Sequence, residues 1–300
     1  MEQFRKRLIV ILGPTASGKS TLAVRLAKKF NGEIINADSR QVYKGMDIGT
    51  AKPTKKEMKG IAHHLFSVAS PKRKFTVAQY KKLAQKTIEK ILKKGKIPIL
   101  CGGTWFYVQA LVDGLVIPEV SPDWKLRKRL EKESAAKLYQ ILKKLDPKRA
   151  KTIDKKNKRR LIRAIEITKK IGKVPSLKKE PLPYPVLMIG IDVSFEKLKE
   201  KIKKRFFQWL KRGLVKEVKK LKESGISFKR IEEFGMHYRV LAQFLKGEIN
   251  KEEMIKRSIK EIEKYAKKQM RWFKKEKRIK WVKNFKEAQK LVKEFLRDLN

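Results

Sequence analysis

A glycine-rich loop near the start of the chain has the residue types and spacing needed to hold phosphate. Residues 13–20 read Gly-Pro-Thr-Ala-Ser-Gly-Lys-Ser and fit the pattern G-x-x-x-x-G-K-S. In such a loop the glycines let the backbone curl, so that successive amides and the start of the next helix face phosphate oxygens. Lys19 adds a cation, and the Ser20 hydroxyl is a ligand for Mg²⁺. The loop predicts a site for a phosphate-bearing small molecule, formed by Gly13, Thr15, Ala16, Ser17, Gly18, Lys19 and Ser20.

The loop alone does not identify the phosphate compound. P-loop kinases and ATPases usually place an acidic residue after an apolar strand, where it positions the metal ion. The apolar run 97–101 ends instead in Gly102-Gly103-Thr104, which weakens the prediction of ATP. Asp192 does follow an apolar run, and it either positions a metal or caps the helix expected from residue 195. A P-loop kinase of small molecules therefore remains the alternative interpretation.

Two further polar residues follow apolar runs, Asp38 after 33–37 and Thr104 after 97–101. Open α/β folds bind ligands at the carboxyl ends of their strands, so both residues are expected near the glycine loop. A carboxylate there is placed to take a proton from a nucleophile held beside the bound phosphate. The competing interpretation is an Asx turn or a cap, which Asp-Ser commonly forms at a strand end. For Asp38 and Thr104 both interpretations stay open on spacing alone.

Apolar runs and helical periodicities alternate in the first third of the chain. Strands are expected at 8–12, 33–37 and 97–101, and helices at 21–30, 76–94 and 105–112. This order predicts a parallel α/β sheet with helices on both faces. The sequence then becomes helical and basic, and prolines mark the edges of that segment. We expect a helical insertion domain at 114–183 and a core domain at 1–113 and 184–300, with later strands at 186–192 and 278–282 and helices at 195–212, 214–224, 238–246 and 251–275.

The charge balance is the bulk property that points to a partner. The chain has 79 Lys and Arg against 31 Asp and Glu, a formal net charge of +48. A lysine-rich, thermophile-like composition is the alternative explanation, but thermophile surfaces add charges of both signs. An unbalanced basic surface is typical of nucleic-acid-binding proteins. The basic stretch 151–163 is a candidate for phosphate-backbone contacts, whereas the aromatic and basic stretch 264–273 either stacks on RNA or faces the core.

Composition also excludes several classes of protein and site. No apolar run approaches the roughly 20 residues of a membrane-spanning helix. Cys101 is the only cysteine, which excludes an internal disulfide and a cysteine-based zinc site. His63-His64 lacks the acidic and cysteine neighbours of a zinc site, so a structural role is favoured. We expect a cytoplasmic protein that does not bind membranes.

Several stretches together resemble one family, the tRNA dimethylallyltransferases, also called tRNA isopentenylpyrophosphate transferases. The longest is Asp-Ser-Arg-Gln-Val-Tyr-Lys-Gly-Met-Asp-Ile-Gly-Thr-Ala-Lys-Pro at 38–53, which is highly specific. The others, in chain order, are the glycine loop 13–20, His63-His64-Leu65, Gly102-Gly103-Thr104, Arg160-Leu161 with 163–166, Tyr238-Arg239, and 266–272. The resemblance spans nearly the whole chain.

This resemblance implies a P-loop NTPase-like fold in which the loop holds the diphosphate of dimethylallyl diphosphate with Mg²⁺ instead of ATP. The dimethylallyl group would go to the exocyclic N6 of the adenosine 3′ to the anticodon, in tRNAs that read codons beginning with U. The expected partner is the tRNA anticodon stem-loop, held by the insertion and the core of a monomer with no obligate protein partner. Flipping of the target base makes physical sense, because a stacked adenine does not present its amine to a buried allyl carbon.

The resemblance also implies roles for individual residues. Asp38 would be the general base, Thr104 would bond the target adenine, and Arg239 would join Lys19 and Ser20 at the diphosphate, with Ser20 also on the metal. The implied tRNA contacts are Asp38, Ser39, Arg40, Gln41, Thr104, Arg127, Arg159, Arg160, Leu161, Ile162 and Arg163.

Two stretches depart from the family pattern. The usual Gly-Tyr-Arg run is longer by two residues, Gly235-Met236-His237-Tyr238-Arg239, which leaves the role of His237 open. Lys158-Arg159 stands where many members have Pro-Gln, so no residue fills the glutamine role.

Overall fold

The computed structural model describes residues 6–176 and 178–297 of the chain. It divides the chain into two compact units, each treated by itself below. The core unit comprises Met1–Gly114 and Pro181–Asn300, and the insertion unit comprises Leu115–Glu180. Within the described residues, no helix combines the length and the apolar content needed to cross a membrane.

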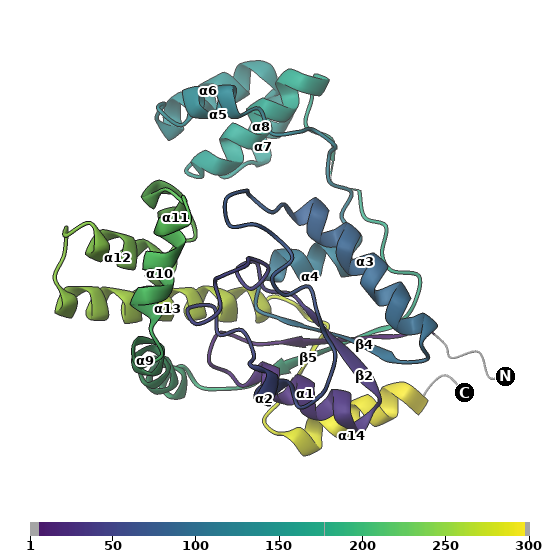
Figure 1. Ribbon diagram of the computed structural model, residues 1–300. Helices are drawn as coiled ribbons and strands as arrows, with labels where there is room; N and C mark the ends of the chain where they lie inside the picture. Colours follow the sequence, from purple (N-terminus) through teal and green to yellow (C-terminus); the bar gives the residue numbers. More distant parts are fainter. Residues whose placement is uncertain (1–5, 177, 298–300) are drawn as a thin grey trace. The chain divides into compact units, whose positions relative to one another are not determined.

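A parallel sheet forms the centre of the core unit (Figure 1). Its strand order is β3-β2-β4-β1-β5-β6, which leaves β1 in the middle with all five of its residues buried. A strand covered on both faces has no polar side to display, and for this reason residues 8–12 are uniformly apolar. The predicted α/β fold, a P-loop-like sheet flanked by helices, is confirmed. The strands are β1 (Leu8–Leu12), β2 (Gly32–Asn36), β3 (His63–His64), β4 (Ile97–Gly102), β5 (Val186–Ile191) and β6 (Ile279–Val282).

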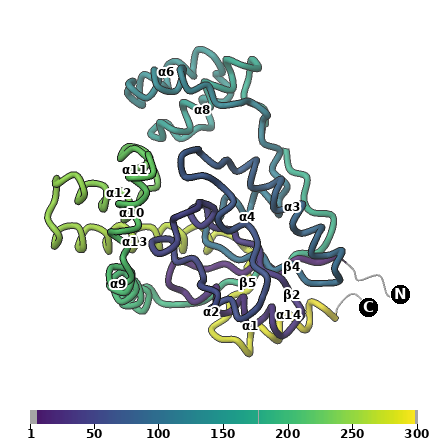
Figure 2. Tube along the Cα trace, viewed as in Figure 1, coloured from purple at the N-terminus to yellow at the C-terminus, as the bar shows by residue number. Residues whose placement is uncertain are grey.

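Two apolar clusters cover the two faces of the sheet. Ile9 and Ile11 of β1 pack with α1 (Lys19–Lys29) and α14 (Phe285–Arg297). Leu8, Val10 and Leu12 point to the opposite face, because side chains alternate along a strand. That face carries α3 (Val77–Lys93), α4 (Trp105–Val112) and the helices that follow β5. The trace in Figure 2 shows the chain leaving β5 and continuing into α9 and the helices after it.

The second half of the core unit is helical, as expected from its apolar periodicity. Polar caps fix where three helices begin, since the side chains of Ser194, Ser227 and Asn250 accept backbone N–H groups of their first turns. Short elements were not predicted, because α2, β3 and α11 contain too few residues to show a period. The helices of this unit not yet given are α2 (Lys55–Met58), α9 (Phe195–Lys211), α10 (Leu214–Glu223), α11 (Phe228–Glu233), α12 (Met236–Leu245) and α13 (Lys251–Phe273).

The insertion unit has its own small apolar core. Its helices are α5 (Trp124–Leu130), α6 (Ala135–Leu145), α7 (Pro147–Thr152) and α8 (Lys158–Ile171). Leu161 and Ile162 of α8 are buried in this core, beside residues of α6. Their side chains are therefore withdrawn from the surface where tRNA contact was predicted. Apolar side chains on the inner face of an amphipathic helix stabilise the unit and leave the outer face to Arg159 and Arg160.

A buried carboxylate joins the N-terminal ends of β2 and β4. Glu33 accepts a hydrogen bond from Lys96 Nζ at 2.9 Å and from Lys94 Nζ at 3.2 Å, and its Oε2 lies 2.7 Å from His64 Nε2. Burial by itself raises the pKa of a carboxyl, but these three donors outweigh it and hold the pKa of Glu33 at about 2. His64 is thus a structural partner, as favoured for the His63-His64 pair.

The depressed pKa of Glu33 predicts a defined loss of stability in acid. An unfolded glutamate titrates near 4.5 and the folded one near 2, so the folded state binds this proton more weakly. The stabilisation is therefore complete above about pH 5 and is lost as the pH falls toward 2. We expect Glu33→Gln to lower the free energy of unfolding by about 2 kcal/mol at pH 7. In denaturant titrations, the gap to the wild type should shrink steadily toward about pH 2.5; a constant gap would contradict the assignment.

Candidate active site

The glycine loop between β1 and α1 has the backbone shape of a phosphate site. Ala16 and Gly18 have positive φ angles of 67° and 92°, and Ser17 between them does not. Where left-handed and right-handed residues alternate in this way, successive backbone amides face the same concavity. Space beside Gly13 is tight, since a Cβ there would lie 2.4 Å from Ser17 Oγ and 3.2 Å from Ser17 Cβ, so Ser17 would have to move. That Ser17 hydroxyl is itself buried without a hydrogen-bond partner among the described residues.

A cleft at the carboxyl end of the sheet brings together segments that are far apart in the sequence. From the loop and α1 come Thr15, Lys19 and Ser20. The strand end after β2 contributes Asp38, and α9 contributes Arg205. The remaining lining residues are Arg40, Gln41, Gly49, Thr50, Ala51, Trp209, Met236, His237, Tyr238, Ile262, Tyr265 and Gln269. The lining combines cations, one carboxylate and apolar side chains.

Two half-buried cations give the cleft its electrostatic character. Burial lowers the pKa of Lys19, the nearby Cys101 and Asp38 oppose that shift, and Arg205 adds to it. Burial also lowers the pKa of Arg205 to about 10, opposed by Glu57. Two like charges withdrawn from water in one cleft are unfavourable unless an anion neutralises them. The cleft is therefore suited to a polyanionic ligand.

Asp38 lies where both sequence interpretations placed it. Its Oδ1 accepts the backbone N–H of Arg40 at 2.8 Å and, more weakly, that of Gln41 at 3.4 Å, which closes an Asx-type turn. Asn36 Oδ1 accepts the Asp38 N–H at 3.0 Å, which fixes the residue from the strand side. The same carboxylate lines the cleft. The turn thus holds one oxygen and leaves Oδ2 for chemistry.

Thr104 does not line the cleft; its side chain instead holds a neighbouring backbone. Its Oγ1 accepts the Ser39 N–H at 2.9 Å, and its own N–H donates to Ala37 O at 3.1 Å. This contact needs a glycine at 102, because a Cβ there would lie 2.2 Å from Ala37 O. Thr104 is consequently a positioning residue for Ser39 in this structure.

Gln269 connects the glycine loop to the turn after β4, a function that the sequence did not assign. Its Oε1 accepts the Thr15 N–H at 2.8 Å, and its Nε2 donates to Gly103 O at 2.9 Å. The side chain is almost fully buried, so water does not compete for either bond. Within 264–273 the rings divide, since Phe273 is buried in the core and Trp272 is exposed.

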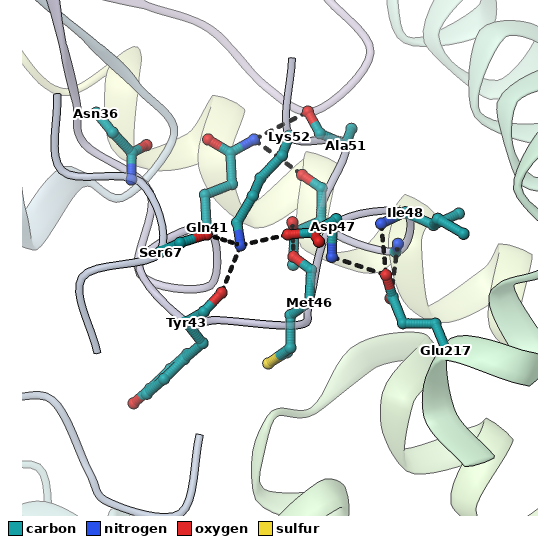
Figure 3. A network of polar contacts seen from close by, with 12 residues as sticks. Asn36, Gln41, Tyr43, Met46, Asp47, Ile48, Ala51, Lys52, Ser67 and Glu217 are labelled. Carbon is teal, nitrogen blue, oxygen red and sulfur yellow. Dashed lines mark hydrogen bonds and ion pairs between the residues drawn. The ribbon is translucent and has the colours of Figure 1, made fainter. Parts of the chain in front are cut away.

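The specific block 38–53 forms a loop that is held by polar contacts rather than by regular structure (Figure 3). Lys52 Nζ donates to Asp47 Oδ1 at 2.6 Å, to Ser67 Oγ at 2.8 Å and to Tyr43 O. Gln41 Nε2 donates to the carbonyls of residues 50 and 51 at 2.9 and 3.1 Å. The loop is thereby closed on itself beside the cleft.

Glu217 of α10 anchors the same loop from outside. Its carboxylate accepts three successive backbone N–H groups, those of Asp47 at 2.7 Å, Ile48 at 2.6 Å and Gly49 at 3.1 Å. The Tyr238 hydroxyl donates a fourth bond at 2.8 Å. A buried carboxylate with four donors is fully satisfied, so this anchor is rigid.

Arg239, predicted to contact the diphosphate, lies outside the cleft lining in this structure. Its side chain is 51% exposed, pairs with Glu261 at 2.6 Å and does not line the cleft. Because Tyr238 faces inward on α12, the helical turn directs the next residue outward. The cleft is lined instead by Arg205, together with Lys19 and Arg40. The position of Arg205 on the buried face of α9, in register with Ile202 and Trp209, was the available sequence signal.

The two residues with open roles are now placed. His237 is buried in the cleft lining beside Trp209 and Gly49, and burial lowers its pKa to about 3, so its ring is neutral at physiological pH. Asp192 is exposed at the end of β5 and lies outside the cleft lining. The helix cap expected there is Ser194 instead.

The chain is similar to known proteins over nearly its whole length. The model of the family described as IPP transferase matches residues 41–276. The tRNA dimethylallyltransferase of Acetivibrio thermocellus is 43% identical over 297 residues, 95% of each chain. The solved tRNA isopentenylpyrophosphate transferase of Bacillus halodurans is 35% identical, with a TM-score of 0.74 over 98% of both chains. A solved eukaryotic dimethylallyltransferase acting on tRNA is 32% identical with a TM-score of 0.76, over 89% of this chain and 69% of that one.

Because Arg205 lines the cleft and Arg239 does not, the two arginines give a paired prediction. Arg205→Gln removes a half-buried cation from the cleft, and we expect it to weaken the binding of inorganic pyrophosphate with Mg²⁺ by about tenfold or more. Arg239→Gln removes the same charge from an exposed site and should leave that affinity within about twofold. Titration calorimetry on the two variants checks this. Equal losses would show that the cleft does not single out Arg205.

Proposed function

We propose a donor and an acceptor for this chain, which belongs to the IPP transferase family and transfers a dimethylallyl group to tRNA. The proposed donor is dimethylallyl diphosphate, and the proposed acceptor is the N6 atom of an adenosine. The proposed target is the adenosine 3′ to the anticodon in tRNAs that read codons beginning with U. The observation that carries the proposal is the grouping of Lys19, Arg205 and Asp38 in one cleft. Two cations there suit a diphosphate, and a carboxylate beside them suits proton removal.

The glycine loop and the two cations hold the leaving group. Loop amides, Lys19 and Arg205 face the diphosphate, whose charge grows as the bond between the allyl carbon and oxygen breaks. Donors fixed in advance stabilise that charge without reorganisation. Bound Mg²⁺ would offset further diphosphate charge. Ser20 lines the same cleft, and its hydroxyl oxygen fits an ion that takes one or two protein ligands plus phosphate oxygens and water.

Asp38 acts on the attacking amine. As N6 of the adenine forms its bond to the allyl carbon, the carbon–oxygen bond to diphosphate breaks and the nitrogen loses a proton to Asp38 Oδ2. The Asx turn holds the carboxylate through Oδ1, so it does not need to be ordered during the reaction. Thr104 contributes by fixing the backbone of Ser39, which is proposed to lie along the RNA together with Arg40 and Gln41.

The tRNA-binding surface is proposed on both units. In the insertion unit Arg159 and Arg160 are exposed and free to meet phosphates. Arg127 and Arg163 are half-buried and bonded to Glu166, which leaves some of their N–H groups for RNA. The net charge of +48 supplies the attraction, and the solved eukaryotic relative acts on tRNA.

One labelling experiment separates this function from that of a small-molecule kinase. The protein is incubated with unmodified tRNA, Mg²⁺ and labelled dimethylallyl diphosphate, or with labelled ATP in a parallel reaction. We expect label from the first donor at N6 of one adenosine per tRNA, located by nuclease digestion and mass spectrometry. Phosphoryl transfer from ATP without prenylation would overturn the proposal, and label at another position would overturn the proposed acceptor.

Asp38→Asn tests the proposed base with little change in structure. Asparagine keeps the oxygen that closes the turn but loses basicity, so kcat should fall by about 10²–10⁴-fold. The Kd for tRNA should stay within about threefold, because a base acts in the transition state. Asp192→Asn makes the same charge change outside the cleft and serves as the control with normal kcat. Loss of tRNA binding with normal single-turnover chemistry would remove Asp38 from this role.

A further inference from the structure

A second concave site lies wholly within the insertion unit, between α5 and α8. It encloses about 530 Å³, and we call it the α5–α8 groove. Val120 and Leu126 provide apolar surface. The cationic side chains are those of Lys125 and Arg129 from α5 and of Lys169 and Lys170 from α8. Neither the sequence patterns nor the reaction proposed above assigns a role to these six residues.

One buried carboxylate fixes the groove between its two helices. Glu166 accepts the Asp123 N–H at 2.7 Å at the start of α5, and it accepts Arg127 Nε and Nη2 at 2.7 and 2.6 Å. Arg163 Nη1 also donates to it. Because these contacts join α5 to α8, the spacing of the groove walls is set without a ligand. Two arginines neutralise Glu166. Asp123, whose Oδ1 accepts the Leu126 N–H, is the second carboxylate that lines the groove, and it offsets one of the four other cations.

The four groove cations are not used by the fold. In the described part of the chain, none of Lys125, Arg129, Lys169 and Lys170 forms an ion pair with a carboxylate. Lys94 and Lys96 show the contrast, because both are bound to Glu33. All four groove cations are exposed. Like charges gathered around one concavity repel, and an anionic ligand would relieve that repulsion.

We propose that the α5–α8 groove binds one unpaired nucleotide of the tRNA acceptor. The proposal rests on the function above and adds a binding site for the same substrate. A nucleotide combines a phosphate, which suits the lysines and the arginine, with a base, which suits the apolar floor of Val120 and Leu126. A paired helix is stiff and convex, so its bases do not enter a pocket of this size. Paired phosphates instead suit the exposed Arg159 and Arg160.

A matched pair of double variants tests the groove. Lys169→Ala with Lys170→Ala removes two groove cations, and Lys143→Ala with Lys144→Ala removes two exposed cations of α6 in the same unit. Kd is measured for unmodified tRNA and for a blunt RNA duplex of matched length, over a range of salt concentrations. We expect the groove variant to bind tRNA about tenfold more weakly than the control variant, with a salt slope lower by about one to two. The affinity for the duplex should fall by the same factor in both variants.

The alternative outcomes each decide against the groove. Equal losses of tRNA affinity in the two variants would mean that the positive charge of the insertion unit attracts tRNA without a specific site in the groove. A loss in the groove variant that is as large on duplex as on tRNA would mean that paired backbone, not an unpaired nucleotide, is bound. Thermal melts check folding, and Lys125→Ala with Arg129→Ala repeats the test from α5. Labelling by the wild type is scored separately, so a failed groove with intact prenylation leaves the proposed function standing.

Discussion

The arrangement of the cleft depends on how closely the ends of β2 and β4 approach each other. Gly102 leaves no space for a side chain against the Ala37 backbone, and the Ala37 N–H donates to Cys101 O at 2.8 Å. This approach brings Thr104 to the Ser39 N–H and therefore sets the turn that holds Asp38. Gln269 then ties the turn after β4, at Gly103, to the glycine loop at Thr15. Catalytic base and phosphate loop are thus placed by backbone contacts that tolerate almost no added volume.

Charge in this protein falls into two groups, and the difference between them identifies the sites. Glu33 and Glu166 each gather several cations around a buried carboxylate, and those cations serve the fold. Among the described residues neither Lys19 nor Arg205 forms an ion pair with a carboxylate, and burial lowers the pKa of both. Against a background of 79 basic residues, position in the sequence says little about function. What distinguishes Lys19 and Arg205 is that they are partly buried in the cleft without an ion-paired carboxylate among the described residues.

The sequence predicted elements whose apolar pattern is long enough to show a period. The run 8–12 became β1, and 105–112 became α4 with the same bounds. The sequence did not show which side of a helix faces the core, and that direction decides what a helical residue contacts. Arg239 lies beside inward-facing Tyr238 and therefore points to solvent, whereas Arg205 shares the buried face of α9. Leu161 and Ile162 stand in a basic stretch but pack inward. Gln269 and Glu217 were beyond prediction, since their partners lie 166 to 254 residues away.

The anchor at Glu217 also has a consequence for the order in which the protein assembles. The three backbone N–H groups of the loop 47–49 donate to Glu217, which lies 168 to 170 positions later in the chain. During synthesis the β1–β4 part of the sheet is available long before α10 has been made, so until then only local contacts such as those of Lys52 and Gln41 hold this loop. The outer anchor of the loop is therefore added only after most of the chain has been made. A nascent or truncated chain that ends before α10 would hold the glycine loop and yet lack a finished cleft.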